Sequence, residues 1–312
     1  MSNNFDSLWV EKYRPIVLTD FIINDSNKAL IESFKAKKEI PNLLFVGTPG
    51  LGKTTLAKII VNNILQCQYL YINASDENGI DTIRTKVTSF AQTKSIDGAI
   101  KVIILDETDG LSMDAQRALR NTMEEFAKIT RFILTANYKY RVINALQSRC
   151  QSIDLTPPLE GAVKRVGFIL KSEKIDVLPQ LKPKLLAFIK DNYPDLRKTI
   201  NELQKFSVTG TLNLSNIDNN EILSLIFSEI KKNNVLQLRK ALIENESQFN
   251  SDYVNLLRAL FNYIDNNETE SSLKKQYLLT IAEHLYRSSF VVDQEINCYA
   301  CFIALGNIKA SI

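Results

Sequence analysis

A glycine-rich stretch, GTPGLGKT (47–54), lies between the short apolar run NLLFV and a helical pattern. Glycines at this spacing let backbone N–H groups turn toward phosphate oxygens. Lys53 is placed to reach β- and γ-phosphates, and the hydroxyl of Thr54 is a ligand suited to Mg²⁺. The stretch therefore predicts a phosphate-binding loop, here called the phosphate loop. A glycine-rich turn that matches by chance is the alternative, and the strand before it and the helix after it disfavour that alternative.

The residues that we expect to contact the nucleotide through this loop form one continuous run. They are Gly47, Thr48, Pro49, Gly50, Leu51, Gly52, Lys53, Thr54 and Thr55.

An acidic pair, Asp106 and Glu107, ends a second apolar run, KVIIL (101–105). A carboxylate at the carboxyl end of a strand beside the phosphate loop can hold the magnesium shell, which is the role predicted for Asp106. Glu107 can polarise an attacking water as a general base. Taken alone, such a pair is also common in solvated turns. Together with an intact phosphate loop it indicates hydrolysis.

Two further polar residues follow apolar runs. Asn137 ends ILTAN (133–137) and can orient a water or contact a γ-phosphate without proton transfer. Arg149 lies in QSRCQ (147–151). The residues alone leave its role open between a chemical one and an ion pair at the surface with Asp154 or another nearby acid.

The elements that must position these residues alternate along the first half of the chain. Continuous, short and β-branched runs predict buried strands, and the segments between them have helical spacing. Strands are predicted at 42–46, 69–73, 101–105 and 131–135, with helices at 53–66, 80–92 and 113–127. This alternation predicts an α/β fold with a parallel sheet covered on both faces.

The pattern changes at DLTPPLEG (154–161), where two prolines mark a boundary. Helical spacing alone continues to about 207, a polar and turn-rich stretch covers 207–220, and the chain is helical from there to its end. We therefore expect three domains: an α/β domain at 1–155, a small helical domain at 156–208 and a helical C-terminal domain at 209–312.

Composition is that of a folded soluble protein, with 45% hydrophobic and 23% charged residues among 312. No apolar stretch approaches the roughly 18 residues of a membrane span, and the polar start is unlike a signal or transit peptide. We expect a cytoplasmic protein, or one of another compartment that contains nucleic acid. Because the net charge is only +3, any contact with nucleic acid must come from local clusters of basic residues.

The cysteines and the single histidine predict packing roles. Cys67 and Cys150 stand alone, and the CxxC of Cys298 and Cys301 lies in the apolar stretch INCYACFIAL. A spacing of three on an apolar helix favours packing over a metal site. His284 lies on a predicted helix, where a structural role is again favoured.

These motifs together resemble an AAA+ ATPase, and specifically a sliding-clamp-loader small subunit of the replication factor C and tailed-phage kind. Three more stretches carry the resemblance: WVEKYRP (9–15), NASDENGIDTIR (73–84) and AQRALRNTME (115–124). It extends from Trp9 to about Gln204. The C-terminal third agrees only in length and helical character.

The resemblance implies an AAA+ P-loop domain, a helical lid and an all-α collar. It also implies an ATP hydrolase with ATP and Mg²⁺ as cofactors. Binding of ATP would open a sliding clamp and favour binding of primer–template DNA, and hydrolysis would release the closed clamp. The implied partners are the clamp, primer–template DNA, further copies of the chain and a second subunit in a pentameric ring, with no membrane. The implied location is the host cytoplasm if the source is viral and the nucleus if it is eukaryotic.

Roles for single residues also follow from the resemblance. Arg149 is implied to be an arginine finger that enters the ATP site of a neighbouring subunit. Arg197, in PDLRKTINEL, resembles the second sensor, which contacts the γ-phosphate of its own subunit. Tyr13, Arg14 and Pro15 resemble the N-terminal element beside the adenine. The alternatives are an arginine on a helix surface for Arg197 and a simple N-terminal cap for the 13–15 segment.

The expected contacts with DNA are to its backbone. Arg84, with the free N–H groups of the first turn of its helix, resembles a phosphate contact that does not depend on sequence. Arg117 or Arg120 is implied to relay DNA contact to the ATP site. For each of the three, a solvated or interface-paired arginine is the alternative.

Two other functions remain open from the sequence. One is another AAA+ DNA motor, such as a helicase or a branch-migration ATPase, although no winged-helix pattern is visible after 207. The other is a structural subunit that does not hydrolyse ATP, although Lys53, Asp106 and Glu107 are all present.

Overall fold

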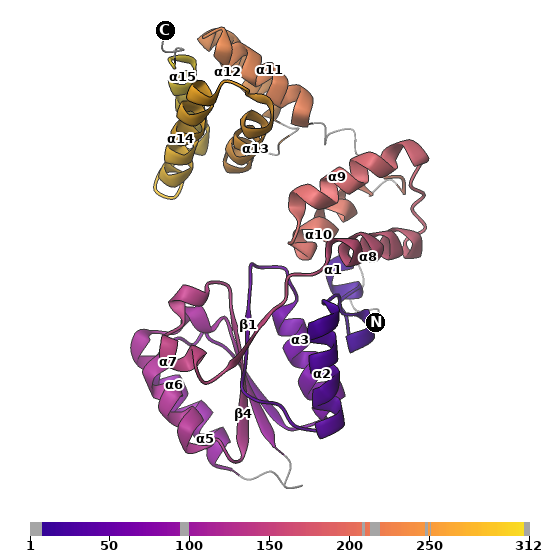
Figure 1. Ribbon diagram of the computed structural model, residues 1–312, viewed down its shortest axis with the longest axis vertical. Coiled ribbons are helices and arrows are strands. Elements are labelled where there is room, and N and C mark those ends of the chain that lie inside the picture. Colours follow the sequence, from indigo (N-terminus) through magenta and orange to yellow (C-terminus); the bar gives the residue numbers. More distant parts are fainter. Residues whose placement is uncertain are drawn as a thin grey trace. The chain divides into compact units, whose positions relative to one another are not determined.

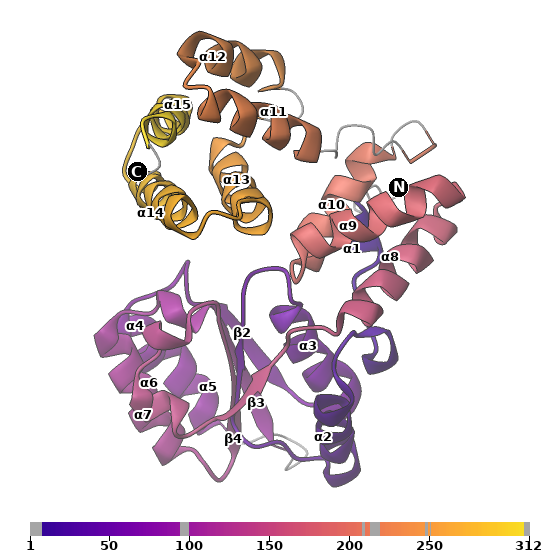
Figure 2. The same cartoon turned by 45° about the horizontal axis from the view of Figure 1, so that its top comes forward.

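The computed structural model describes residues 8–93, 100–207, 210–212, 219–246, 249 and 251–308. The chain forms two compact units, Met1–Leu212 and Asn213–Ile312, which are drawn in Figures 1 and 2. Within the described ranges no helix combines the length and the apolar character of a membrane span. The turn-rich stretch predicted at 207–220 lies largely outside the described residues.

A five-stranded sheet forms the centre of the first unit, in the order β2-β3-β4-β1-β5. All four strand pairs are parallel, which confirms the predicted fold class. The strands are β1 (Leu43–Val46), β2 (Tyr69–Asn73), β3 (Lys101–Asp106), β4 (Thr130–Ala136) and β5 (Gln151–Asp154). The first four lie where they were predicted.

The strand β5 was missed by the sequence analysis. Its residues read QSID, and of these only Ile153 is buried. A short edge strand with three exposed residues has neither an apolar run nor a clear alternation, so composition could not reveal it.

Helices cover both faces of the sheet, because β3 sends alternate side chains to opposite sides. Val102 and Ile104 pack with α2 (Asp25–Lys37) and α3 (Lys53–Ile59). Ile103 and Leu105 pack in a second core on the other face, where the helices are α4 (Ile80–Thr82), α5 (Thr88–Gln92), α6 (Met113–Glu125) and α7 (Asn144–Gln147). Figure 1 shows the two groups of helices on either side of the sheet.

Two of the predicted helices form with a local change of winding. The helix predicted at 53–66 is α3 followed by π-helical Ile60–Leu65, and the one predicted at 80–92 contains π-helical Ile83–Val87 between α4 and α5. The helix α6 begins after Ser112, whose hydroxyl accepts a hydrogen bond from the Ala115 N–H at 3.2 Å. Thus the helices on either side of the sheet are confirmed, with boundaries shifted by a few residues.

Three helices complete the first unit: α8 (Leu159–Ser172), α9 (Lys182–Asn192) and α10 (Leu196–Phe206). They follow the proline pair at 157–158, as predicted. The N-terminal helix α1 (Trp9–Lys12) lies against them, as Figure 2 shows. The N–H of Trp9 donates a hydrogen bond to Oε1 of Gln204 at 3.0 Å. The helix α1 is therefore fixed to α10, the last helix of this unit.

The second unit is helical in its described part, with one hydrophobic core. Its helices are α11 (Asn219–Lys231), α12 (Val235–Glu244), α13 (Tyr253–Asn267), α14 (Ser271–Arg287) and α15 (Gln294–Gly306). Cys298 and Cys301 are fully buried in this core, which confirms their packing role. His284 is also buried, with its Nδ1 3.0 Å from Oδ1 of Asn297.

Candidate active site

The phosphate loop connects β1 to α3, and its backbone conformation favours glycine at Gly50 and Gly52 among other positions. Gly50 and Gly52 have φ values of +84° and +81°, which side chains other than glycine rarely adopt. A Cβ atom on Gly50 would lie 1.9 Å from Oδ1 of Asp195, at the start of α10. The loop is therefore packed directly against the first turn of the helix that carries Arg197.

Lys53 begins α3, and only 8% of its surface is exposed. Its ammonium donates hydrogen bonds to the carbonyl oxygens of Gly47 at 2.7 Å and Thr48 at 2.9 Å, and to Oδ1 of Asn137 at 2.8 Å. Burial lowers the pKa of Lys53, and the nearby Asp106 carboxylate opposes that shift. Three oxygen atoms thus hold the ammonium at the base of the loop.

Asp106 ends β3 and accepts hydrogen bonds from three side chains. The Thr54 hydroxyl lies 2.8 Å from both of its carboxylate oxygens. The Thr135 hydroxyl donates to Oδ1 at 2.6 Å, and the Tyr71 hydroxyl donates to Oδ2 at 2.9 Å. Asp106 is 8% exposed, so its charge is stabilised by these donors rather than by bulk water.

A magnesium ion fits this donor set. The Thr54 hydroxyl and the Asp106 carboxylate are hard oxygen ligands in direct contact, of the kind that Mg²⁺ prefers. Among the described residues no three His, Cys, Asp or Glu side chains gather into a metal site. One carboxylate with one hydroxyl suits an ion whose remaining ligands are water and substrate phosphate.

Glu107 adopts a backbone conformation that is uncommon for residues other than glycine, with φ +56°. Its N–H donates to the Thr135 hydroxyl at 2.9 Å, and this bond holds the turn that follows β3. Its carboxylate accepts a hydrogen bond from the Ser75 hydroxyl at 2.5 Å. Thr135 therefore contacts both acidic residues, and Ser75 fixes the direction of the Glu107 side chain.

Asn137 follows β4 and lies between the lysine and a third acid. Its side-chain oxygen accepts from Lys53, and its N–H donates to Oδ2 of Asp109 at 3.1 Å. The N–H of Tyr138 donates to the same Asp109 oxygen at 3.0 Å. Asp109 thus fixes the backbone that presents the Asn137 amide to the site.

These residues surround one cavity of about 280 Å³. It gathers nine of the predicted nucleotide-binding residues, namely Arg14, Pro49, Gly50, Gly52, Lys53, Thr54, Thr55, Asn137 and Arg197, together with Asp106 and Glu107. Gly47 and Thr48 contribute their carbonyl oxygens to Lys53 instead, and the Leu51 side chain packs into the core. Four cationic side chains and two carboxylates therefore face one space.

A second cavity, of about 590 Å³, lies between the N-terminal segment and α8. Tyr13 and Arg14 line it, whereas Pro15 does not. The Tyr13 hydroxyl donates to Glu173 at 2.6 Å, and Arg165 donates to the Tyr13 carbonyl oxygen at 2.5 Å. Burial and the Glu173 contact raise the pKa of Tyr13. Arg14 lines both cavities, so the two share this residue in their walls.

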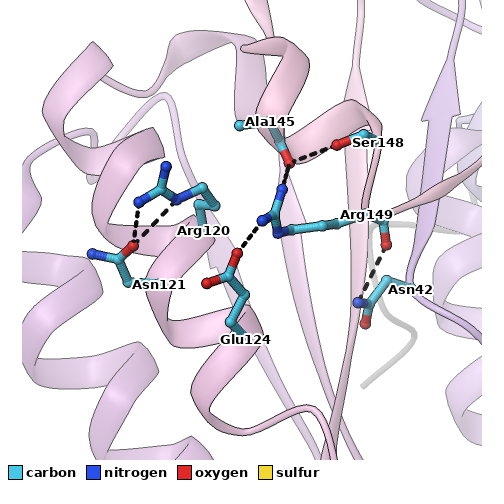
Figure 3. A network of polar contacts seen from close by, with 7 residues as sticks. All are labelled: Asn42, Arg120, Asn121, Glu124, Ala145, Ser148 and Arg149. Carbon is cyan, nitrogen blue, oxygen red and sulfur yellow. Dashed lines mark hydrogen bonds and ion pairs between the residues drawn. The ribbon is translucent and has the colours of Figure 1, made fainter.

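Arg149 lies outside both cavities, just after α7 (Figure 3). Its guanidinium donates to the Ala145 carbonyl oxygen at 2.7 Å and forms an ion pair with Glu124 of α6. The acid that it contacts is therefore Glu124 and not Asp154. The structure does not bring Arg149 to the other predicted catalytic residues of its own chain.

The predicted DNA-contacting arginines also lie away from the cavities. Arg84 is exposed on the π-helical turn after α4. Arg117 pairs with Asp114 at 3.1 Å, and Arg120 donates to the Asn121 side chain at 2.7 Å (Figure 3). Arg84 takes part in none of the ion pairs that the structure shows among the described residues.

Four residues of the site were missed by sequence reasoning: Lys58, Tyr71, Ser75 and Thr135. Lys58 lies one helical turn after Thr54, so its place on the site's face of α3 was predictable. The other three come from β2, the segment after it and β4, and contact the acidic pair only because these strands are neighbours of β3. Strand order was the missing information.

Two family models match successive parts of the chain. Residues 43–157 match the ATPase family associated with various cellular activities (AAA), and residues 159–217 match the AAA+ ATPase lid domain of the sliding-clamp-loader large subunit. The chain is 36% identical to the replication factor C small subunit of Methanococcus vannielii, with 96% of this chain and 99% of that protein covered. It is 33% identical to the replication factor C small subunit of Archaeoglobus fulgidus, with 98% of each covered.

Solved structures of RuvB from Thermotoga maritima are similar in fold. One RuvB variant gives a TM-score of 0.51 over 76% of this chain and 88% of that one, at 21% identity. The structure described as the RuvB Holliday junction branch migration motor gives 0.50 over 75% and 87%, also at 21% identity. At this identity the likeness concerns the fold alone.

Proposed function

The chain belongs to the family of replication factor C small subunits and is an ATPase subunit of a sliding-clamp loader, and from this premise we propose how its site works. As a clamp-loader subunit it acts with a sliding clamp and DNA within a multi-subunit complex. The observation that carries the proposal is that phosphate loop, acidic pair, Asn137 and Arg197 line a single cavity. The resemblance to this family is confirmed by the relatives and the family models.

The two adjoining cavities divide the nucleotide between them. The phosphates of ATP occupy the smaller cavity, where Lys53 exchanges its carbonyl contacts for β- and γ-phosphate oxygens. The adenosine occupies the larger cavity beside Tyr13 and Arg14, and Pro15 contributes through its place next to Arg14 in the chain. Arg197 approaches the γ-phosphate from α10, so nucleotide binding draws the helices α8–α10 toward the sheet.

Thr54 and Asp106 hold Mg²⁺ with the nucleotide. When bound, the ion neutralises charge on the β- and γ-phosphates. Asn137 orients the attacking water or the γ-phosphate, and Glu107 accepts the proton of that water. The Ser75 hydroxyl contacts only one of the two Glu107 carboxylate oxygens, so the other oxygen can accept this proton.

Arg149 completes the site of a neighbouring subunit. In its own chain it lies outside the cavity, yet it is exposed enough to contact another molecule. A planar cation that arrives only on assembly stabilises charge in the transition state and makes hydrolysis depend on the neighbour. We place it in a pentameric ring of copies of this chain with a second subunit, with domains at 1–155, 156–208 and 209–312.

ATP binding then favours the clamp-open state that binds primer–template DNA, and hydrolysis releases the closed clamp. The complex acts in the compartment that holds the replicating DNA. A branch-migration ATPase shares the fold, but the family relation extends over nearly the whole chain. A structural subunit without hydrolysis is disfavoured because Lys53, Asp106 and Glu107 are all present and face one cavity.

The ATPase rate of the assembled complex tests the proposed function. Sliding clamp and primed DNA together should raise the rate well above that of the complex alone. Stimulation by forked or four-way DNA without any effect of the clamp would instead indicate another DNA motor.

The DNA contacts lead to a prediction for Arg84. Arg84→Ala should weaken binding to all primed templates alike, because its contact is to phosphate. The slope of log affinity against log salt concentration should fall by about one contact, or roughly 0.9 for duplex DNA. Arg287→Ala, which removes an exposed arginine of the second unit, should leave the slope unchanged. A loss confined to certain DNA sequences would contradict backbone contact.

A further inference from the structure

Tyr71 belongs to the edge strand β2 and reaches the acidic end of the neighbouring strand. It is in register with Ile104 of β3, so its side chain leaves the sheet on the same face as Asp106. Its hydroxyl donates a hydrogen bond to Oδ2 of Asp106 at 2.9 Å. Tyr71 also lines the smaller of the two cavities, although 39% of its surface is exposed.

The ring of Tyr71 also contacts a side chain of α3. The ammonium of Lys58 lies 4.9 Å from the ring centroid, within the range of a cation–π interaction. Burial of the phenol and its contact with Asp106 raise the pKa of Tyr71. Because an ionised carboxylate can only accept hydrogen bonds, the Tyr71 hydroxyl is the donor in its contact with Asp106.

Each carboxylate oxygen of Asp106 accepts hydrogen bonds from two side chains. Metal binding would change some of these hydrogen bonds and leave others in place. Thr54 contacts both oxygens, but its own oxygen is the expected metal ligand. The partners that do not depend on the metal are Thr135 on Oδ1 and Tyr71 on Oδ2. One fixed donor on each oxygen prevents the carboxylate from rotating.

We propose that Tyr71 is a positioning residue for Asp106, whose hydroxyl holds the carboxylate in the orientation that binds Mg²⁺ together with Thr54. The inference rests on the magnesium role proposed above for Asp106. It predicts that the Tyr71 hydroxyl, which does not bind the metal itself, determines how tightly the ion is held. Partners of this kind are commonly worth about 10- to 100-fold in metal affinity.

The test is a Mg²⁺ titration of nucleotide binding without turnover. The full-length chain binds a fluorescent, non-hydrolysable ATP analogue, and the Mg²⁺ concentration that gives half of the gain in affinity is measured. Tyr71→Phe keeps the ring over Lys58 and should raise this concentration about 10-fold. Tyr69→Phe is the matched control, because Tyr69 lies two residues earlier on the same face of β2 without contacting Asp106. It should behave as the wild type.

A double-mutant cycle with Asp106→Asn separates positioning from a general structural effect. Adding Tyr71→Phe to Asp106→Asn should change the Mg²⁺ dependence no further. Tyr71→Leu, which lacks the same hydroxyl, should reproduce the rise, and thermal unfolding of the metal-free chain checks that each variant folds. An unchanged or lower Mg²⁺ requirement in Tyr71→Phe, or an equal shift in the Asp106→Asn background, would overturn the inference. A wild-type chain whose nucleotide affinity ignores Mg²⁺ would instead overturn the proposed metal site itself.

Discussion

Arg149→Ala should lower the ATPase rate of the assembled complex by up to about 10³-fold, the lower end of what arginine fingers contribute. ATP should still bind to the mutant subunit, because Lys53 and Arg197 of its own cavity are untouched. The rate is measured under single-turnover conditions in the assembled complex, and ATP binding is measured on the isolated subunit.

Glu124→Gln is the control that the structure offers for this experiment. It removes the acid that pairs with Arg149 but keeps the arginine. If Arg149 served only in that ion pair, the two variants would have the same small effect, since exposed pairs contribute about 0–1 kcal/mol. A finger predicts a large loss for Arg149→Ala and a rate within a few-fold of wild type for Glu124→Gln.

Lys53→Ala and Glu107→Gln should separate binding from chemistry. Lys53→Ala removes the cation at the base of the phosphate loop and should abolish detectable ATP binding, and hydrolysis with it. Glu107→Gln keeps the shape of the side chain but removes the base, so ATP, clamp and DNA should still bind. Its turnover should fall by about 10²- to 10⁴-fold, the usual contribution of a general base.

Equilibrium binding of a fluorescent ATP analogue, followed by a single-turnover assay, distinguishes the two variants. Ser75→Ala is a useful companion, because it removes the hydroxyl that holds Glu107 without touching either acid. It should preserve ATP binding. Equal loss of ATP affinity in Lys53→Ala and Glu107→Gln would show that Glu107 belongs to the binding machinery.

The sequence was sufficient to predict those parts of the site that are formed by residues close together along the chain. The phosphate loop needs a strand, a glycine turn and a helix in succession, so 47–54 could be recognised without any tertiary information. The end of β3 was equally clear, because a buried apolar run stops at two adjacent acids. Four of the five strands followed from the same contrast between apolar runs and polar ends.

Contacts between neighbouring strands could not be obtained in this way. Thr135 and Tyr71 contact Asp106 because β4 and β2 flank β3, and nothing local to either residue signals that order. The sequence also left the acid that pairs with Arg149 open between Asp154 and another nearby acid, and the structure shows that it is Glu124. Asp154 is closer along the chain, but Glu124 is brought near by the packing of α6 against α7.

Mixing two inactive variants tests most directly whether Arg149 acts across a subunit boundary. Complexes are assembled from a mixture of Arg149→Ala and Lys53→Ala chains. As a control, the ATPase rate of a mixture of Lys53→Ala and wild-type chains shows whether a complex stays active when some of its sites are inactive. At some interfaces an intact phosphate loop from one variant then meets an intact arginine from the other. We predict that part of the ATPase activity returns on mixing. The contradicting result is a mixture that stays as inactive as its components, although mixed complexes form and a single inactive site is tolerated. That result would show that Arg149 acts within its own chain.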